Sequence, residues 1–176
     1  MFRNLVLVGF MGSGKSSVGR LLSSLTGFAL VDTDNLVAQE ARLSIPEIFR
    51  RHGEQHFREL ETAALRGLVG RIGLIVATGG GIVISPENRA LLPRIGPVAW
   101  LDASPDHLHQ RVRNSKRPLL QTDDPRGTLL ELYKAREHLY RETATVRIDS
   151  SHLTHRQTAQ AVLKTLEELR PENLSG

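Results

Sequence analysis

The chain has 176 residues, of which 40% are hydrophobic and 24% are charged, and its formal net charge is +4. This length suits one domain that buries its core without metals or disulfides, and the absence of cysteine excludes a disulfide framework and a cysteine nucleophile. The first apolar stretch is too short for a signal sequence or a membrane span, so we expect a cytoplasmic protein with no membrane partner. Basic and acidic residues are interspersed, so we expect no nucleic-acid partner.

Five short apolar runs alternate with segments of helical periodicity. The runs occupy residues 5–8, 29–31, 74–77, 98–101 and 145–148. This alternation predicts an α/β layer fold with a parallel sheet and a single domain over residues 1–170. We interpret residues 171–176 as a flexible tail.

Helix starts are marked by capping residues. Ser85 and Ser104 each precede a proline, and Ser44 and Thr154 open capping boxes. Two helices are predicted to pack on the sheet through apolar stripes. The stripes comprise Val18, Leu21, Leu22 and Leu25 in the first helix, and Thr158, Ala161, Val162, Thr165, Leu166 and Leu169 in the last.

Residues 9–16 read Gly-Phe-Met-Gly-Ser-Gly-Lys-Ser and lie between the first apolar run and a predicted helix. Such a phosphate loop turns backbone N–H groups and a helix N-terminus toward one centre, where a polyphosphate binds. Lys15 is expected to bridge the β- and γ-phosphates, and the Ser16 hydroxyl to coordinate Mg²⁺. The motif therefore predicts a nucleoside-triphosphate enzyme.

Two carboxylates follow the second apolar run. If the strand continues through Asp32 and Asp34, both side chains point the same way at the carboxyl edge of the sheet, where ligands bind in open α/β folds. One would then reach the metal and the other an acceptor hydroxyl. The alternative is a pair of helix-capping residues. The third run has no acidic residue at its end, so Asp32 is the best candidate for assisting Mg²⁺.

Three consecutive glycines, Gly79, Gly80 and Gly81, follow the third run. This choice is costly unless a ligand or another backbone must approach closely; a plain flexible turn is the alternative.

Two arginines stand out by position. Arg58 lies on a helix with Glu61 one turn onward, which is expected to hold the guanidinium. Arg136 occupies the inward face of another predicted helix, between apolar and aromatic neighbours. A substrate carboxylate would supply the partner that a buried arginine needs, whereas a structural salt bridge or a snorkelling side chain is the alternative.

A long polar interruption spans residues 114–128 and holds Lys116 and Arg117 beside a proline. Loops of this length in compact domains are often mobile lids, and we place a lid at about residues 112–127. Arg117 is expected to stabilise charge on the transferring phosphoryl group, and Lys116 to be a solvated surface residue.

Taken together, these motifs resemble the shikimate kinase family over nearly the whole chain, from Gly9 to about Leu169. The matching segments are residues 9–16, 32–34, 57–61, 78–81, 117–120 and 135–140. The resemblance implies a three-layer P-loop fold similar to nucleoside monophosphate kinases, with a five-stranded parallel sheet, a substrate-binding subdomain at about residues 34–61 and a lid. It implies Mg²⁺-dependent transfer of the ATP γ-phosphoryl group to the 3-hydroxyl of shikimate, with a monomer as the default state.

The resemblance also implies a role for each matching residue. ATP would be bound by Gly12, Ser13, Gly14, Lys15, Ser16, Ser17 and Arg117. Shikimate would be bound by Asp34, Arg58, Gly79, Gly80, Gly81 and Arg136. Lys15, Asp34 and Arg117 would serve catalysis, and Ser16 and Asp32 would serve the metal. Either Arg111 or Arg113 would contact adenine.

Two other functions fit parts of this pattern. Another small-molecule kinase, such as a gluconate or nucleoside monophosphate kinase, would share the phosphate loop. A non-catalytic P-loop module that senses nucleotides would share it too, although the intact set of charged site residues argues against lost turnover.

Overall fold

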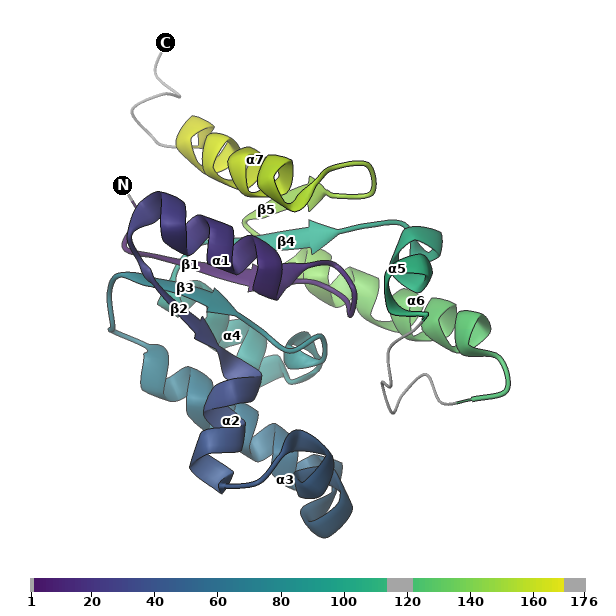
Figure 1. Ribbon diagram of the computed structural model, residues 1–176. Coiled ribbons are helices and arrows are strands. Elements are labelled where there is room, and N and C mark those ends of the chain that lie inside the picture. The colour runs from purple at the N-terminus through teal and green to yellow at the C-terminus, as the bar shows by residue number, and fades with distance from the viewer. Residues whose placement is uncertain (1, 114–121, 170–176) are drawn as a thin grey trace.

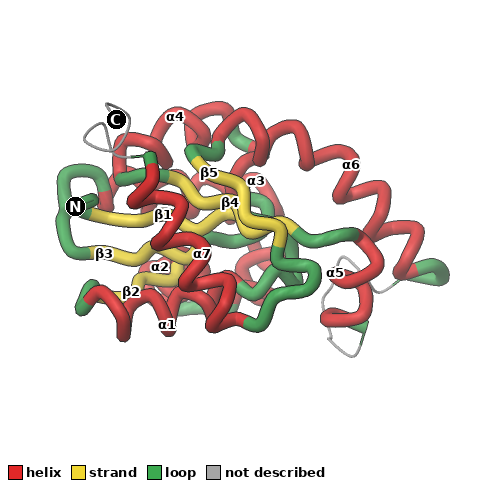
Figure 2. Tube along the Cα trace, turned by 90° about the horizontal axis from the view of Figure 1, so that it is seen from above, coloured by secondary structure: helices red, strands yellow, loops and turns green. Residues whose placement is uncertain are grey.

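A five-stranded, fully parallel sheet forms the centre of the molecule. The computed structural model describes residues 2–113 and 122–169. The strands are β1 (Asn4–Val8), β2 (Ala29–Asp32), β3 (Leu74–Ala77), β4 (Val98–Asp102) and β5 (Val146–Asp149). They lie side by side in the order β2-β3-β1-β4-β5 (Figure 2). The predicted three-layer α/β fold is confirmed, and the expected runs match the strands to within one residue.

Helices cover both faces of this sheet, as Figure 1 shows. The described helices are α1 (Lys15–Thr26), α2 (Thr33–Ala41), α3 (Ile45–Leu68), α4 (Pro86–Ile95), α5 (Pro105–Val112), α6 (Pro125–Thr143) and α7 (His155–Glu168), with a 3-10 turn, η1, at Ile82–Ile84. Helices α1 and α7 pack on one face and helices α3, α4 and α6 on the other.

The central strand shows why the apolar runs are continuous rather than alternating. Leu5 and Leu7 pack with α1 and α7, whereas Val6 and Val8 belong to the core on the opposite face. All four side chains are fully buried. A parallel sheet with helices on both faces requires apolar residues at every strand position, and this explains the pattern.

The predicted caps are present, whereas the predicted stripes were too long. Ser85, Ser104 and Thr154 accept backbone hydrogen bonds at the starts of α4, α5 and α7, and Ser44 forms its capping box at α3. However, Leu25 and Leu169 are 55% and 47% exposed, so the buried part of each stripe ends before these positions.

The expected loop at residues 114–128 was also too long at its C-terminal end. Helix α6 begins at Pro125, with Asp124 as the N-cap that accepts from the backbone N–H of Gly127 at 2.9 Å. An acidic N-cap followed by proline is a standard helix start, and proline at the first position needs no N–H partner. Residues 114–121, including Lys116 and Arg117, lie outside the described residues, as does the expected tail at 171–176.

Helices α2 and α3 form a lobe that projects from the sheet, at the bottom of Figure 1. A separate small core holds them together, formed by Val37, Ile48 and Phe57. Helix α3 is bent at Gly53, whose φ of 81° is non-helical. The bend lets one end of α3 pack on α2 while the other reaches the sheet through Leu65 and Leu68.

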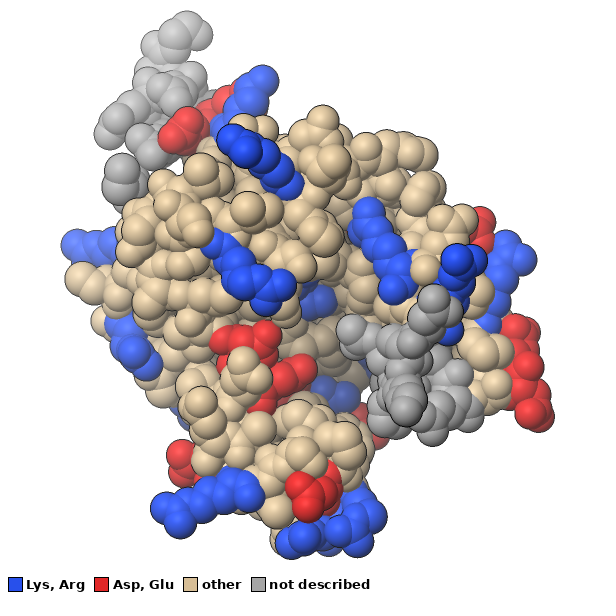
Figure 3. Space-filling model, in the orientation of Figure 1, with Lys and Arg blue, Asp and Glu red and all other residues tan. Residues whose placement is uncertain are grey.

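The surface shows no concentration of basic side chains on the face drawn in Figure 3, where Lys and Arg are dispersed among other residues. None of the helices in the described part of the chain has both the length and the hydrophobicity needed to cross a bilayer.

A single side chain ties three segments together at the start of the sheet. Asn4 is 3% exposed, and its Nδ2 donates to the carbonyl oxygens of Arg71 at 2.6 Å and Ile95 at 2.8 Å. Its Oδ1 accepts from the backbone N–H of Leu74 at 3.0 Å. Asn4 thus joins β1, the turn before β3 and the end of α4.

Replacement of Asn4 by alanine should therefore destabilise the fold. Asn4→Ala leaves three backbone groups without their partner, and we expect the free energy of unfolding to fall by about 3 kcal/mol. Urea denaturation measures this value. Asn35 is exposed on α2 and provides the matched control, since Asn35→Ala removes the same atoms from solvent. Equal stability of the two variants would show that the Asn4 bonds contribute little.

Candidate active site

The phosphate loop leaves β1 at the carboxyl edge of the sheet and enters α1. Gly12 and Gly14 have φ values of 81° and 90°, a left-handed backbone that other residues rarely adopt. The Lys15 ammonium donates to the carbonyl oxygens of Gly9 at 2.7 Å and Phe10 at 3.0 Å. The loop therefore folds around the lysine, with Ser13 Oγ a further acceptor at 3.3 Å, and the predicted contact of Lys15 with phosphates stays a prediction.

Ser16 and Asp32 lie side by side next to this loop. The Ser16 hydroxyl donates to Asp32 Oδ2 at 3.3 Å, which places a hydroxyl and a carboxylate oxygen together. Oxygen donors of this kind suit Mg²⁺, so the two residues fit the metal that the phosphate loop implies. Ser17, the next residue on α1, accepts from Arg20 at 3.3 Å.

Asp32 and Asp34 do not share a strand, and the helix-capping alternative holds for Asp32. Strand β2 ends at Asp32, and α2 begins at Thr33. Asp32 Oδ1 caps this helix by accepting from the backbone N–H groups of Asp34 at 3.0 Å and Asn35 at 3.3 Å. The capping preference of aspartate ended the strand, and the two carboxylates consequently face different neighbours. Asp32 faces Ser16, whereas Asp34 lines a cavity.

This cavity has a volume of about 640 Å³ and lies beside the phosphate loop, since Met11 forms part of its wall. Six of its lining residues are the six predicted acceptor-binding residues: Asp34, Arg58, Gly79, Gly80, Gly81 and Arg136. They come from α2, α3, the turn after β3 and α6, and the fold brings all six together.

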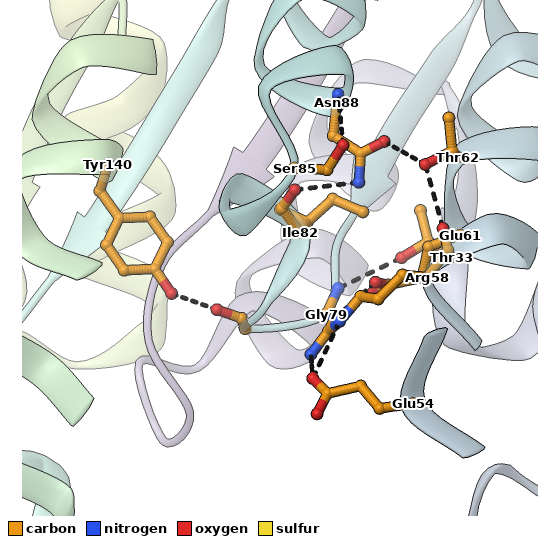
Figure 4. A network of polar contacts seen from close by, with 11 residues as sticks. Thr33, Glu54, Arg58, Glu61, Thr62, Gly79, Ile82, Ser85, Asn88 and Tyr140 are labelled. Atoms are coloured by element: carbon orange, nitrogen blue, oxygen red, sulfur yellow. Dashed lines mark hydrogen bonds and ion pairs between the residues drawn. The ribbon is translucent and has the colours of Figure 1, made fainter. Parts of the chain in front are cut away.

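Arg58 is held by carboxylates on its own helix (Figure 4). Its Nη1 donates to Glu61 at 2.6 Å, and its Nη2 donates to Glu54 at 2.9 Å. Burial lowers the pKa of Arg58, but the ion pairs and hydrogen bonds with Glu61 and Glu54 together outweigh this effect and raise the pKa above its ordinary value. A Cβ atom on Gly81 would lie 2.5 Å from Nη1 of Arg58, so a larger residue there would displace the guanidinium from this position.

Glu61 is a fully buried carboxyl group at the base of the cavity. Burial raises its pKa to about 6, while Arg58 opposes this change and Asp34 adds to it. A Cβ on Gly79 would lie 2.7 Å from Asp34 Oδ1 and 3.1 Å from Glu61 Oε1. Gly79 therefore lies against two carboxyl groups. The backbone of the turn after β3 comes close to neighbouring side chains, so this segment is not a plain flexible turn.

Arg136 is 9% exposed on the inner face of α6. Among the described residues, no hydrogen bond or ion pair reaches its guanidinium, which lies 5.8 Å from the centre of the Phe10 ring. Burial lowers its pKa, and the positive charge of Arg58 lowers it further. A structural salt bridge within the described residues therefore does not account for Arg136.

The two candidates for an adenine contact differ in position. Arg111 donates to the carbonyl oxygen of Ser150 at 2.8 Å and lies 3.5 Å from that of Gly12, so it spans the phosphate loop and the turn after β5. Arg113 is exposed at the C-terminal end of α5.

Sequence reasoning missed the apolar wall of the cavity. Phe49 and Phe57 pack with ring centroids 4.8 Å apart and line the cavity. Ile45 and Pro46, at the start of α3, line it too. Their positions depend on the bend in α3, which no local pattern indicated.

Comparison with known proteins points to one family. The family model for shikimate kinase matches residues 11–167. A shikimate kinase of Cupriavidus pinatubonensis is 46% identical over 165 residues, covering 93% of this chain and 86% of the relative. One from Geobacter sulfurreducens is 49% identical over 150 residues, covering 85% and 82%.

Among solved structures, shikimate kinase from Acinetobacter baumannii in complex with shikimate has a TM-score of 0.90 and 38% identity, covering 97% of both chains. The chain belongs to the shikimate kinase family. It is therefore an ATP-dependent kinase, and its sheet and helices form the P-loop fold of this family.

The raised pKa of Glu61 makes a prediction about stability. Glu61 binds its proton more tightly in the folded state, with a pKa of about 6 against the ordinary value of 4.5, so its contribution to stability is fully present below pH 4.5 and is lost as pH rises through about 6. The free energy of unfolding of the wild type, relative to Glu61→Gln, should fall by about 2 kcal/mol between about pH 4 and about pH 7.

Chemical denaturation across this pH range measures the difference. Glu40→Gln, at an exposed position on α2, is the matched control and should follow the wild-type profile. A difference between wild type and Glu61→Gln that does not change with pH would contradict the prediction.

Proposed function

We propose that this chain transfers the γ-phosphoryl group of ATP to the 3-hydroxyl of shikimate, giving ADP and shikimate 3-phosphate in the pathway to chorismate and the aromatic amino acids. The observation that carries the proposal is the cavity beside the phosphate loop, whose wall includes all six expected acceptor-binding residues. Membership of the shikimate kinase family names the acceptor.

The nucleotide would lie on the phosphate loop. We assign its phosphates to Gly12, Ser13, Gly14, Lys15, Ser16 and Ser17, with Arg117 from the proposed lid. Ser16 and Asp32 would hold Mg²⁺, directly or through water, and the bound metal would neutralise phosphate charge. Arg111, which contacts the phosphate loop, is the better supported candidate for the adenine contact.

The acceptor would lie in the cavity. Arg58 and Arg136 would bind the shikimate carboxylate, since a planar guanidinium matches a carboxylate with two parallel hydrogen bonds. Gly80 and Gly81 would add backbone contacts, because no described residue accepts a hydrogen bond from their N–H groups. Gly79 lets Asp34 approach the same space.

The protein's part in the chemistry is positioning and charge stabilisation. Asp34 would bind the shikimate hydroxyl groups and accept the proton of the attacking 3-hydroxyl. Lys15 and Arg117 would stabilise charge on the transferring group, while closure of a lid at about residues 112–127 would exclude water.

We further propose that one chain acts alone in the cytoplasm, where Mg·ATP is available. The cavity is formed within a single chain, which supports a monomeric unit of function. The lobe of α2 and α3, at about residues 34–61, would act as a substrate-binding subdomain within a single domain over residues 1–170, because it has its own small core.

The test of this function is ADP release from Mg·ATP with shikimate, gluconate or AMP as acceptor. We expect stimulation by shikimate alone and a product whose mass matches shikimate plus one phosphoryl group. Stimulation by gluconate or AMP would identify another small-molecule kinase. ATP binding without stimulation by any acceptor would favour the nucleotide-sensing module.

Arg136 provides a sharper prediction for the acceptor site. Arg136→Ala should raise the shikimate KM at least about tenfold, because the charged hydrogen bonds to the carboxylate are lost. The ATP KM should change by less than about twofold, since Arg136 lies outside the phosphate loop. Arg141→Ala, at an exposed position on the same helix, is the control and should resemble the wild type. Equal weakening of both substrates would count against the assignment.

A further inference from the structure

We propose that Tyr140 is a positioning residue for the acceptor, because its hydroxyl holds the peptide that joins Gly80 to Gly81 in the orientation that the cavity requires. This inference rests on the proposed function. It concerns the glycine loop, defined here as residues 78–81, which connects β3 to η1.

Tyr140 is a rigid support for this loop. It is fully buried, and its ring stacks on Trp100 of β4 with centroids 5.8 Å apart and an interplanar angle of 18°. Its hydroxyl donates to the carbonyl oxygen of Gly80. Burial raises the pKa of Tyr140, so the hydroxyl keeps its proton and remains a donor at all physiological pH values.

The hydrogen bond acts through the geometry of one peptide group. The carbonyl of Gly80 and the N–H of Gly81 belong to the same planar trans peptide and point in opposite directions. Tyr140 approaches the loop from the side opposite to Arg58 and Glu61 (Figure 4). The hydrogen bond to Tyr140 fixes the direction of the Gly80 carbonyl and therefore points the Gly81 N–H toward the side of Arg58. Gly81 itself lines the cavity.

Other contacts close a turn around this peptide without bonding to either of its two polar groups. Gly79 N–H donates to Thr33 Oγ1 at 3.2 Å, the Ile82 N–H donates to the carbonyl oxygen of Gly79 at 3.2 Å, and the Ile84 N–H donates to that of Gly81 at 3.0 Å. The central peptide of such a turn can take either of two opposite orientations, as in type I and type II turns, and glycine permits both. In the described part of the chain, the Tyr140 hydroxyl is the side chain that holds the Gly80 carbonyl.

Helix α6 also carries Arg136, the proposed carboxylate-binding residue, at a fixed distance from Tyr140. Arg136 and Tyr140 are one turn apart on α6 and both face inward. A Cβ on Gly80 would lie 3.2 Å from the backbone N of Met11, so the loop packs directly on the phosphate loop. Tyr140 thus links the carboxylate end of the cavity to the phosphate loop through the glycine loop.

Tyr133 offers a matched control on the same helix. Its hydroxyl donates to Asp102 Oδ1 at 2.8 Å and does not contact the glycine loop. Tyr133→Phe and Tyr140→Phe each remove one bonded hydroxyl and keep the ring. A role limited to stability would affect both variants alike.

The experiment compares kcat and the KM of each substrate in the wild type and the two variants. We expect kcat/KM for shikimate to fall about tenfold in Tyr140→Phe, with the ATP KM within about twofold of wild type. Tyr133→Phe should match the wild type. The emission of Trp100, the only tryptophan, and the melting temperature report whether the ring stack and fold survive.

A second measurement does not depend on turnover. Hydrogen exchange of a peptide spanning residues 78–85 should be faster in Tyr140→Phe than in Tyr133→Phe and wild type. Equal kinetics and equal exchange in the two variants would overturn the inference. A wild-type protein that does not phosphorylate shikimate would instead overturn the proposed function, while the exchange result would still report on the Tyr140 contact.

Discussion

The parallel pairing of β1 with β3 is the constraint from which the site follows. Leu7 lies in register with Ala77, so the phosphate loop and the glycine loop leave adjacent strands at the same edge of the sheet. Neighbouring strands are separated by about 4.8 Å, so two turns that start there must pack on each other. Gly80 accordingly lies against Met11. A phosphate donor bound to one loop and an acceptor bound beside the other would thereby lie within reach for direct transfer.

The buried charge of the cavity favours an anionic acceptor. Arg58 is neutralised by Glu61 and Glu54, whereas the guanidinium of Arg136 has no ion-pair partner among the described residues. Burial and the like charge of Arg58 both disfavour a charged Arg136, as its lowered pKa indicates. An anionic group in the cavity would offset this cost. The electrostatics thus favour a small acid over a neutral sugar, in line with membership of the shikimate kinase family.

Local capping preferences decide the structure at two points of the chain. Asp32 caps α2, which was one of the two alternatives for this residue, so β2 does not extend to Asp34. The pair Asp124 and Pro125 starts α6 within the segment that we had expected to be a loop. Both capping signals can be recognised in the sequence. The apolar wall at Phe49 cannot be recognised there, because it depends on the bend at Gly53 and on packing between α2 and α3.

The sequence by itself determined the strands, the phosphate loop and three charged residues of the cavity, Asp34, Arg58 and Arg136, whereas Arg50, which also lines the cavity, was not predicted. These features arise from patterns within a few residues: continuous apolar runs, glycines with positive φ, and capping side chains. Only the tertiary structure decided which distant groups meet, such as Arg111 with Gly12 and Tyr140 with Gly80. Such contacts join residues 60 or 99 positions apart, where no local periodicity reports the partner. They follow from strand order and helix packing, which are properties of the whole chain.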